Sequence, residues 1–339
     1  MESPAIHHTS SPDGTRLAFW SLGRGRPLLY IGVPCCSHVQ AETKVAPLLE
    51  WYHRLAQNFQ LVRLDLRGYG GSQRDGVELT LTRLQEDVLA VADALELPQF
   101  SIFTHGGSAA TALSLASRSD RVRGLVVFDG WADGVNLDVH KSMTATLQLA
   151  RDRFDVFSSF VARAVLQAPG KVASEIDDLL RKSATAAQWE RFTALQVSTD
   201  VTALLSSIRC PTLVIHSGDG MITGHGEESL AIARAIPGAQ FAAYEFPSFP
   251  MGDTTGIFSA MVDFLRPENV EHHVPAGVIS AREAEVLELL ALGRTNRQIA
   301  DELVISQQTV ARHVHNLLSK LDVSNRTEAA AWAARRRKS

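Results

Sequence analysis

The first 266 residues alternate short apolar runs, rich in β-branched and aromatic residues, with segments whose apolar residues recur every three or four positions. The first pattern is typical of buried strands and the second of helices packed along one face. Strands are predicted within 15–23, 27–33, 59–67, 100–104, 124–130, 211–219 and 241–246, and helices within 81–97, 108–118, 229–237 and 256–267. This alternation predicts an α/β fold whose mostly parallel sheet is covered by helices.

Residues 134–206 break this rhythm. The stretches 140–167, 173–183 and 185–196 all have helical periodicity, and no strand-like run separates them. A helical block between two parts of a sheet predicts a lid, at about 134–206. We therefore expect one α/β domain over residues 1–266 that carries this lid.

Residues 267–277 contain two prolines, one glycine and no apolar periodicity, which predicts a linker. The linker histidines, His272 and His273, have no further Cys or His at ligand spacing, so we expect no metal site. No cofactor is expected either. A second domain is predicted over residues 278–339.

Four short helical patterns fill this second domain. Ser280 and Glu283 have the spacing of a capping box, Gly293 can end the first helix, and Thr295 and Ser306 can begin the second and third. The tight turn between the second and third helices has the spacing of a helix-turn-helix, which places its later helix in the major groove of DNA.

The segments REAEVLELLALG, QIADEL, TVARHV and KLDVSNRTEA resemble the LuxR-type helix-turn-helix domain along its whole length. Positions 311, 312 and 315 face away from Val310, Val314 and Leu317 on a helix. The resemblance implies that Ala311, Arg312 and His315 read bases. It further implies contacts to phosphates or groove edges by Asn296, Gln307, Gln308, Thr309, Lys320 and Arg326. A dimer on two half-sites of double-stranded DNA is expected, with RNA polymerase as a further candidate partner.

Charge supports this division of the chain. Residues 278–339 hold 10 Lys+Arg and 7 Asp+Glu, a net of +3, which leaves 33−10=23 basic and 37−7=30 acidic residues, a net of −7, before them. A basic tail on an acidic body favours a polyanionic partner. Three cysteines, the lack of a signal-peptide pattern and the lack of a long apolar run predict a cytoplasmic protein without a membrane span.

The segments DLRGYGGS, FTHGGSAATALSLA and RVRGLVVFDG, in that order, resemble the α/β-hydrolase fold over residues 8–266. In particular, the chain resembles a bacterial group that joins such a domain to a LuxR-type or nucleotide-cyclase output. The nucleophile of that fold stands on a sharp turn between a strand and a helix. The resemblance places Gly106 at this position, while an alternative register would place Ser108 there.

The other two positions of the catalytic triad are also altered. The acid position falls on Gly220, with Asp219 one residue before it, and no histidine occurs from residue 226 to residue 271, where the base should lie. A serine hydroxyl without an imidazole base is a poor nucleophile. We expect no serine-hydrolase activity, and the alternative is an enzyme that uses Cys35, Cys36 or Ser108 as a substitute nucleophile.

The fold would still keep a pocket at the carboxyl ends of its strands, beneath the lid. Its predicted lining consists of Val33, Cys35, Cys36, His38, His105, Gly106, Gly107, Trp131, Trp189 and Phe192. Some of these have a plainer interpretation: the aromatic lid residues as core and the cysteines as buried, inert thiols. The combined hypothesis is a one-component transcription regulator whose non-catalytic domain binds a small, mainly apolar metabolite. A protein-binding module without a ligand is the third alternative.

Overall fold

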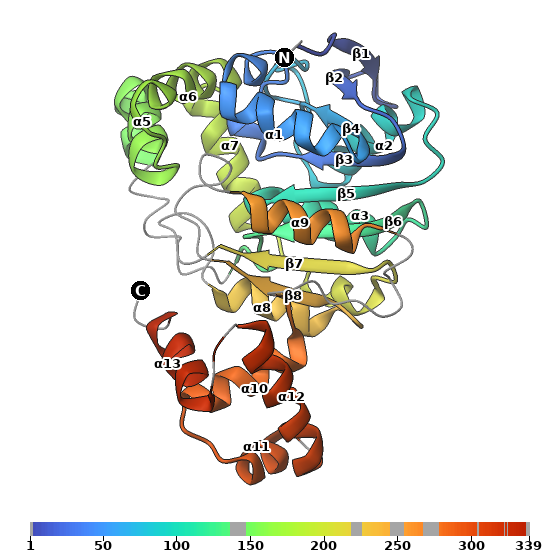
Figure 1. Cartoon of the computed structure of the whole chain (residues 1–339). Coiled ribbons are helices and arrows are strands. Elements are labelled where there is room, and N and C mark those ends of the chain that lie inside the picture. The colour runs from blue at the N-terminus through green and yellow to red at the C-terminus, as the bar shows by residue number, and fades with distance from the viewer. Residues whose placement is uncertain are drawn as a thin grey trace.

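The computed structural model describes residues 3–135, 147–217, 226–244, 254–266, 278–303, 305–321, 323 and 325–336. Its strands form one sheet in the order β1-β2-β4-β3-β5-β6-β7-β8-β9 (Figure 1). The strands are β1 (His7–Ser10), β2 (Arg16–Leu22), β3 (Arg26–Ile31), β4 (Phe59–Leu64), β5 (Phe100–His105), β6 (Val122–Phe128), β7 (Thr212–His216), β8 (Gln240–Ala243) and β9 (Val278–Ser280). Strands β3 to β8 run parallel, whereas β1, β2 and β9 are antiparallel to their neighbours. The predicted α/β class with a mostly parallel sheet is confirmed.

Every predicted apolar run contains a strand, but two strands at the edges of the sheet and one helix were not predicted. Strand β1 is short and polar, and β9 has only three residues, so neither carries a readable alternation. Strands at the edge of a sheet are often short or polar, because a long apolar edge with one unpaired side would pair with another chain. Helix α1 (Ala46–Ala56) buries five of its side chains and was also missed.

Two layers of helices cover the sheet. Helices α1 and α9 (Thr255–Phe264) share one apolar core with one face, while α2 (Leu81–Ala94), α3 (Ala109–Ala116) and α8 (Gly226–Ala235) share another core with the opposite face (Figure 1). Helix α2 shows the cause: Leu84, Val88 and Val91 recur at helical spacing and are buried. Burial of such stripes provides most of the stability of these helices.

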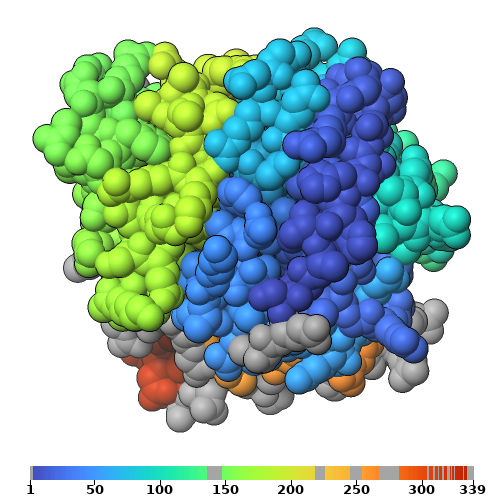
Figure 2. Space-filling model, turned by 90° about the horizontal axis from the view of Figure 1, so that it is seen from above, coloured from blue at the N-terminus to red at the C-terminus, as the bar shows by residue number. Residues whose placement is uncertain are grey.

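The predicted lid contains helices α5 (Phe154–Phe160), α6 (Gly170–Ser183) and α7 (Ala186–Val197). Thr185 begins α7 with a capping box, in which its hydroxyl accepts the Gln188 N–H and the Gln188 carboxamide accepts the Thr185 N–H. Helices α6 and α7 contact the short helix η1 (Pro34–Cys36), which follows β3. Figure 2 shows the lid helices side by side with the N-terminal elements on one face of the molecule.

The C-terminal region consists of α10 (Ala281–Ala291), α11 (Asn296–Leu303), α12 (Gln307–Lys320) and α13 (Arg326–Arg336). Gly293, at φ 75°, ends α10, and its N–H donates to the Leu290 carbonyl. Thr295 begins α11, because its hydroxyl accepts the Gln298 N–H. The core of the helix-turn-helix contains Ile299, Val310 and Leu317, each fully buried.

The two parts of the chain are joined at the β8 edge of the sheet. Strand β9 pairs with β8, placing Phe241 opposite Ile279, and helix α10 contacts α8. Residues 278–280 therefore belong structurally to the sheet, although their sequence begins the helix-turn-helix region.

Several predicted features fall outside the described residues. These are the linker 267–277 with its histidines, the candidate acid positions Asp219 and Gly220, and the segment 245–253, which follows β8. Of the helices that the structure describes, none is both long and apolar enough to cross a lipid bilayer.

Candidate functional site

The turn between β5 and α3 has the geometry of a nucleophile elbow, with glycine at its sharpest point. Gly106 has φ 55°, in the left-handed region that favours glycine. A Cβ atom added to Gly106 would lie 3.2 Å from Cγ2 of Val33. The left-handed residue of this strand-to-helix turn therefore carries no side chain.

Ser108, the alternative nucleophile, lies one step beyond this point. It ends the short helix η3 (Gly106–Ser108) and is 1% exposed. Its hydroxyl donates a hydrogen bond of 2.7 Å to the carbonyl of Gly32, just after β3. The hydroxyl therefore ties the elbow to the neighbouring strand.

The Cys35–Cys36 loop rests on buried charged groups. Arg63 forms an ion pair with Glu42 and donates to the Ser37 hydroxyl at 2.9 Å, and the Ser37 hydroxyl donates to Asp65 at 2.7 Å. Burial alone would raise the pKa of Glu42, but the Arg63 charge together with hydrogen bonds from Tyr52, Arg63 and Ser37 keeps that pKa below its usual value. Burial also raises the pKa of the Cys35 thiol. Cys35 therefore remains a protonated, weakly nucleophilic thiol at neutral pH.

His105 precedes the elbow at the end of β5. Its ring lies 5.7 Å from the Tyr30 ring, centroid to centroid. Burial, reinforced by the charge of Arg63, lowers the pKa of His105 to about 4. The imidazole is consequently neutral at physiological pH.

An Asp–His pair at the ends of β6 and β7 was not identified from the sequence. Nδ1 of His216 lies 3.0 Å from Oδ1 of Asp129, and the Ser217 N–H donates to the same oxygen at 2.8 Å. Asp129 itself adopts φ 44°. Strands β6 and β7 are neighbours in the sheet, with Phe128 opposite Ile215. Asp129 and His216 follow these two residues, so the strand order brings them together. A Cβ on Gly226, the first residue of α8, would lie 3.1 Å from Nε2 of His216, so this imidazole faces α8.

Part of the predicted ligand lining does come together. Cys35 and Phe192 are core members of one apolar cluster with Tyr69, and Val33, Cys36 and Trp189 pack against it. The Phe192 ring meets the Tyr69 ring edge-on at 5.9 Å, and the Tyr69 hydroxyl donates to the Gln188 carbonyl at 3.0 Å.

Two other predicted lining residues, His38 and Trp131, are not members of this cluster. His38 lies by the turn after β4, where its ring would be 3.8 Å from a Cβ on Gly71, and its Nδ1 accepts the Ala41 N–H at 3.4 Å. Trp131 is buried just after β6.

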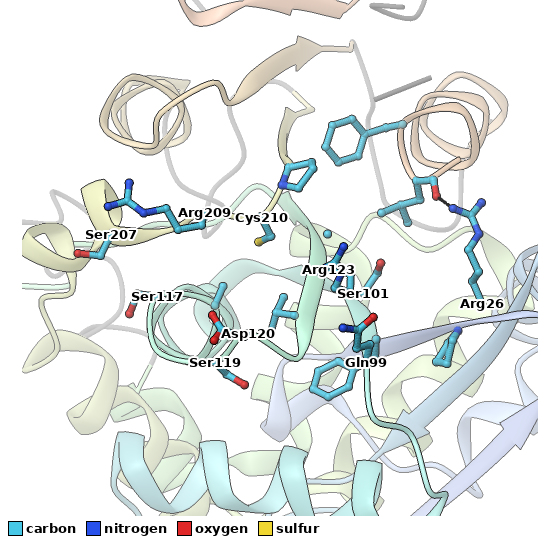
Figure 3. Close-up of a pocket in the computed structure, with 18 residues that line it drawn as sticks. Arg26, Gln99, Ser101, Ser117, Ser119, Asp120, Arg123, Ser207, Arg209 and Cys210 are labelled. Atoms are coloured by element: carbon cyan, nitrogen blue, oxygen red, sulfur yellow. Dashed lines mark hydrogen bonds between the residues drawn. The ribbon is translucent and has the colours of Figure 1, made fainter. Parts of the chain in front are cut away.

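A hollow of about 1110 Å³ lies at the opposite, amino ends of β3, β5, β6 and β7 (Figure 3). It is lined by Arg26, Arg123 and Arg209 together with serine hydroxyls and the Cys210 thiol. The Arg26 guanidinium donates to the Leu265 carbonyl. None of the predicted ligand residues lines this hollow.

Helix α12 presents the arrangement expected of a recognition helix. Val310 and Leu317 are buried against the domain core, while Gln307 and Ala311 are exposed. Asn296 and Arg326 contact each other, since an Arg326 N–H donates to Asn296 Oδ1 at 3.0 Å, and Arg326 also donates to the Arg294 carbonyl. The side chains of Gln308, Thr309, Arg312, His315 and Lys320 lie outside the described part of the structure.

Two family models match the chain. Residues 277–333 match the family described as bacterial regulatory proteins, luxR family, and residues 49–247, more than half of the chain, match serine aminopeptidase, S33. The transcriptional regulatory protein LiaR of Bacillus subtilis (strain 168) is 49% identical over 65 residues, 19% of this chain and 31% of LiaR. DegU of Brevibacillus brevis is 44% identical over 62 residues, 18% of this chain and 26% of DegU. The matched region thus spans about a third or less of each regulator.

Solved structures resemble the N-terminal region. A hydrolase from Pseudomonas aeruginosa PA01 has a TM-score of 0.63 at 22% identity, covering 78% of this chain and 99% of that chain. The enol-lactonase from Burkholderia xenovorans LB400 has a TM-score of 0.64 at 18% identity, covering 76% and 99%. At such identities the likeness establishes the α/β-hydrolase fold.

Proposed function

Since the chain belongs to the serine aminopeptidase S33 family and ends in a luxR-family regulatory domain, we propose that it is a one-component transcription regulator with a non-catalytic sensor. In this proposal the hydrolase-fold domain binds a small metabolite without turning it over. Occupancy of that site then changes how the C-terminal domain engages double-stranded DNA.

The observation that carries the non-catalytic part is Gly106 at the elbow. The turn keeps its left-handed backbone, at φ 55°, and offers no side-chain nucleophile. The nearby Ser108 hydroxyl donates to the Gly32 carbonyl, and the Cys35 thiol has a raised pKa. Of the two buried substitute nucleophiles, the Ser108 hydroxyl is therefore hydrogen-bonded and the Cys35 thiol is protonated.

The apolar cluster between η1 and α7 supports a mainly apolar ligand. Aromatic and thiol side chains there, including Phe192 and Cys35, supply the lining that binding sites for small molecules typically show. Only a ligand that binds two arrangements of the protein unequally can shift their populations. The proposal therefore requires the lid or the junction at β9 to differ between those arrangements.

The regulatory part rests on α11 and α12, which form the helix-turn-helix. We propose that two copies of the chain bind two half-sites, with α12 in the major groove and Ala311, Arg312 and His315 toward the bases. RNA polymerase is the further partner that such a regulator would contact.

The decisive experiment uses the full-length chain. A duplex selected from a random DNA library is labelled, and fluorescence anisotropy reports its affinity with and without fractions of a metabolite extract. A fraction that shifts both the affinity and the Tm supports the sensor.

Turnover of p-nitrophenyl esters that disappears in Cys35→Ala, Cys36→Ala or Ser108→Ala would instead establish an enzyme. A Tm unmoved by every fraction would favour a protein-binding module.

A further inference from the structure

The hollow at the amino ends of β3, β5, β6 and β7 lies at the opposite end of the sheet from the elbow, and three arginines line it. Figure 3 shows Arg123 in the middle of the labelled side chains, with Arg209 on one side and Arg26 on the other. The volume of about 1110 Å³ is large enough for a small molecule. The lining comes from segments far apart in the chain, so no single motif of the sequence indicated it.

An irregularity in the sheet places Arg123 at this hollow. Phe100 of β5 pairs with Val122 of β6. The next residue of β5, Ser101, pairs with Gly124. Arg123 is therefore an additional residue of β6 with no register partner on β5, which is the arrangement of a β-bulge. Bulges change the direction of a side chain and are frequent next to functional sites.

Gly124, which follows the bulge, allows close packing at the edge of the hollow. A Cβ on Gly124 would lie 2.9 Å from Cδ2 of Leu265 and 3.1 Å from Oγ of Ser101. Leu265 follows the last residue of α9, and its carbonyl accepts a hydrogen bond from Arg26. The Ser101 hydroxyl and the Arg26 guanidinium are thus both held at the end of α9, beside the bulge.

The charges around the hollow favour an anion. Among the described residues that line it, Asp120 is the single carboxylate, against three guanidinium groups. Helices α3 and α9 also end at the hollow, and the carbonyl end of a helix carries about half a negative elementary charge. About one positive charge remains after these three contributions are subtracted. This local excess is in the acidic part of the chain, whose net charge is −7.

Arg123 and Arg209 supply hydrogen-bond donors that the protein itself leaves available. Among the described residues, neither forms an ion pair with a carboxylate, and Arg209 makes only a long hydrogen bond of 3.5 Å to the Ser206 carbonyl. The hydroxyls of Ser101 and Ser207 also line the hollow and form no hydrogen bond with a described residue. We propose that this hollow is a second binding site, separate from the site under the lid, for a phosphorylated small molecule.

The donor set selects phosphate over carboxylate. A guanidinium presents two parallel N–H groups that match two oxygens of either anion. A phosphate monoester has three such oxygens and about two negative charges at pH 7, so it can bind two guanidinium groups and a hydroxyl together. A carboxylate has two oxygens and one charge. Apolar side chains of the lining, such as Phe100 and Phe264, would contact the remainder of the ligand.

Three compounds with one shared ring test the ligand class: phenyl phosphate, benzoate and phenol. Isothermal titration calorimetry with the full-length protein should show saturable binding of phenyl phosphate at one site. Benzoate should bind roughly tenfold more weakly, because it has fewer charge-assisted hydrogen bonds, and phenol should not bind. Benzoate binding as tight as that of phenyl phosphate would overturn the phosphate class. No binding of phenyl phosphate would overturn the site.

Substitutions at exposed positions assign the binding to the hollow. Arg123→Gln and Arg209→Gln should each weaken phenyl phosphate binding roughly tenfold, because each removes a charged donor. Asp120→Asn should strengthen binding, because it removes the opposing charge. Arg118→Gln is the matched control, since Arg118 is exposed close to the end of α3 but does not line the hollow. Equal weakening by Arg118→Gln would overturn the site, because it would indicate general attraction to basic side chains.

DNA is the other source of phosphate groups that the experiment must distinguish. Fluorescence anisotropy with a labelled random duplex should give the same affinity for Arg123→Gln and for the unaltered protein. A loss of DNA affinity in Arg123→Gln, together with no binding of phenyl phosphate by the unaltered protein, would assign the hollow to the DNA backbone and overturn the small-molecule site. The sensor site under the lid would remain unaffected by that result.

Discussion

Arg234 in α8 and Glu288 in α10 form an ion pair across the junction of the two domains, with Nη2 and Oε2 2.7 Å apart. Glu285 lies near the same guanidinium, at 3.8 Å. At its other end, α8 begins beside His216, which pairs with Asp129 at the carboxyl ends of β6 and β7. Helix α8 is therefore in contact with the carboxyl ends of β6 and β7 and with the helix-turn-helix domain.

Reversing the charge of Arg234 tests this junction. Arg234→Glu places a third carboxylate against Glu285 and Glu288, so hydrogen exchange of the β9 amides should accelerate. Both partners are more than a third exposed, so the loss in global stability should stay below about 1 kcal/mol. Glu288→Arg in the same chain should restore slow exchange. Arg24→Glu, at an exposed site, is the control, and equal acceleration there would argue against a specific contact.

Gly106→Ser places a hydroxyl at the position that the proposed function assigns to the missing nucleophile. We expect a stability loss of about 1–2 kcal/mol, because φ 55° is unfavourable for a residue with a Cβ atom and Val33 is close. No esterase activity should appear, because no histidine follows β8 before residue 272. Denaturant unfolding and p-nitrophenyl butyrate hydrolysis measure the two effects. Measurable turnover would mean that another imidazole reaches the elbow.

Cys35 should resist alkylation in the folded protein. Burial raises its pKa, so the thiolate that reacts with iodoacetamide is scarce at pH 7.5. Mass spectrometry should find Cys35 unmodified under native conditions and modified in urea. Alkylation at the rate of an unfolded thiol would favour the enzyme hypothesis.

His105 should make the protein sensitive to mild acid. Its pKa is lowered to about 4 from an ordinary value of 6.5, so between these values the unfolded chain binds a proton that the folded chain does not. Stability is therefore full above pH 6.5 and decreases as the pH falls toward 4. Between pH 7.5 and pH 5, the His105→Gln variant should lose about 2 kcal/mol less of its free energy of unfolding than the unaltered protein does. Urea unfolding at the two pH values measures this difference. An unchanged loss in the variant would contradict this role for His105.

The DNA-binding residues should separate into two classes. Arg312→Ala should relax sequence preference, and Lys320→Ala should weaken binding to all sequences and reduce its salt dependence. Arg326→Ala should also lower the stability of the domain by about 1 kcal/mol, because Arg326 bonds to Asn296 and to the Arg294 carbonyl. Anisotropy titrations at several salt concentrations, with selected and random duplexes, distinguish these effects. Identical losses on both duplexes for Arg312→Ala and Lys320→Ala would contradict the assignment.

Local patterns in the sequence were sufficient for most of the elements. The runs at 100–104 and 124–130 became β5 and β6, and Thr295 and Gly293 cap helices as their residue types predict. These features could be read directly because strand and helix periods, capping side chains and left-handed glycines act over a few residues. The polar β1 and the three-residue β9 could not be read, because their formation depends on a neighbouring strand.

The sequence by itself determined the α/β class, the helix-turn-helix region and the glycine that stands at the elbow. Tertiary structure alone decided which groups meet: Gln196 lies on Gly107 and Val33 beside Gly106 at the elbow, and Asp129 pairs with His216 at the ends of β6 and β7. These contacts join residues far apart in the chain. They exist because strand order and the return of the lid onto the sheet bring the residues together, and no local period encodes that arrangement.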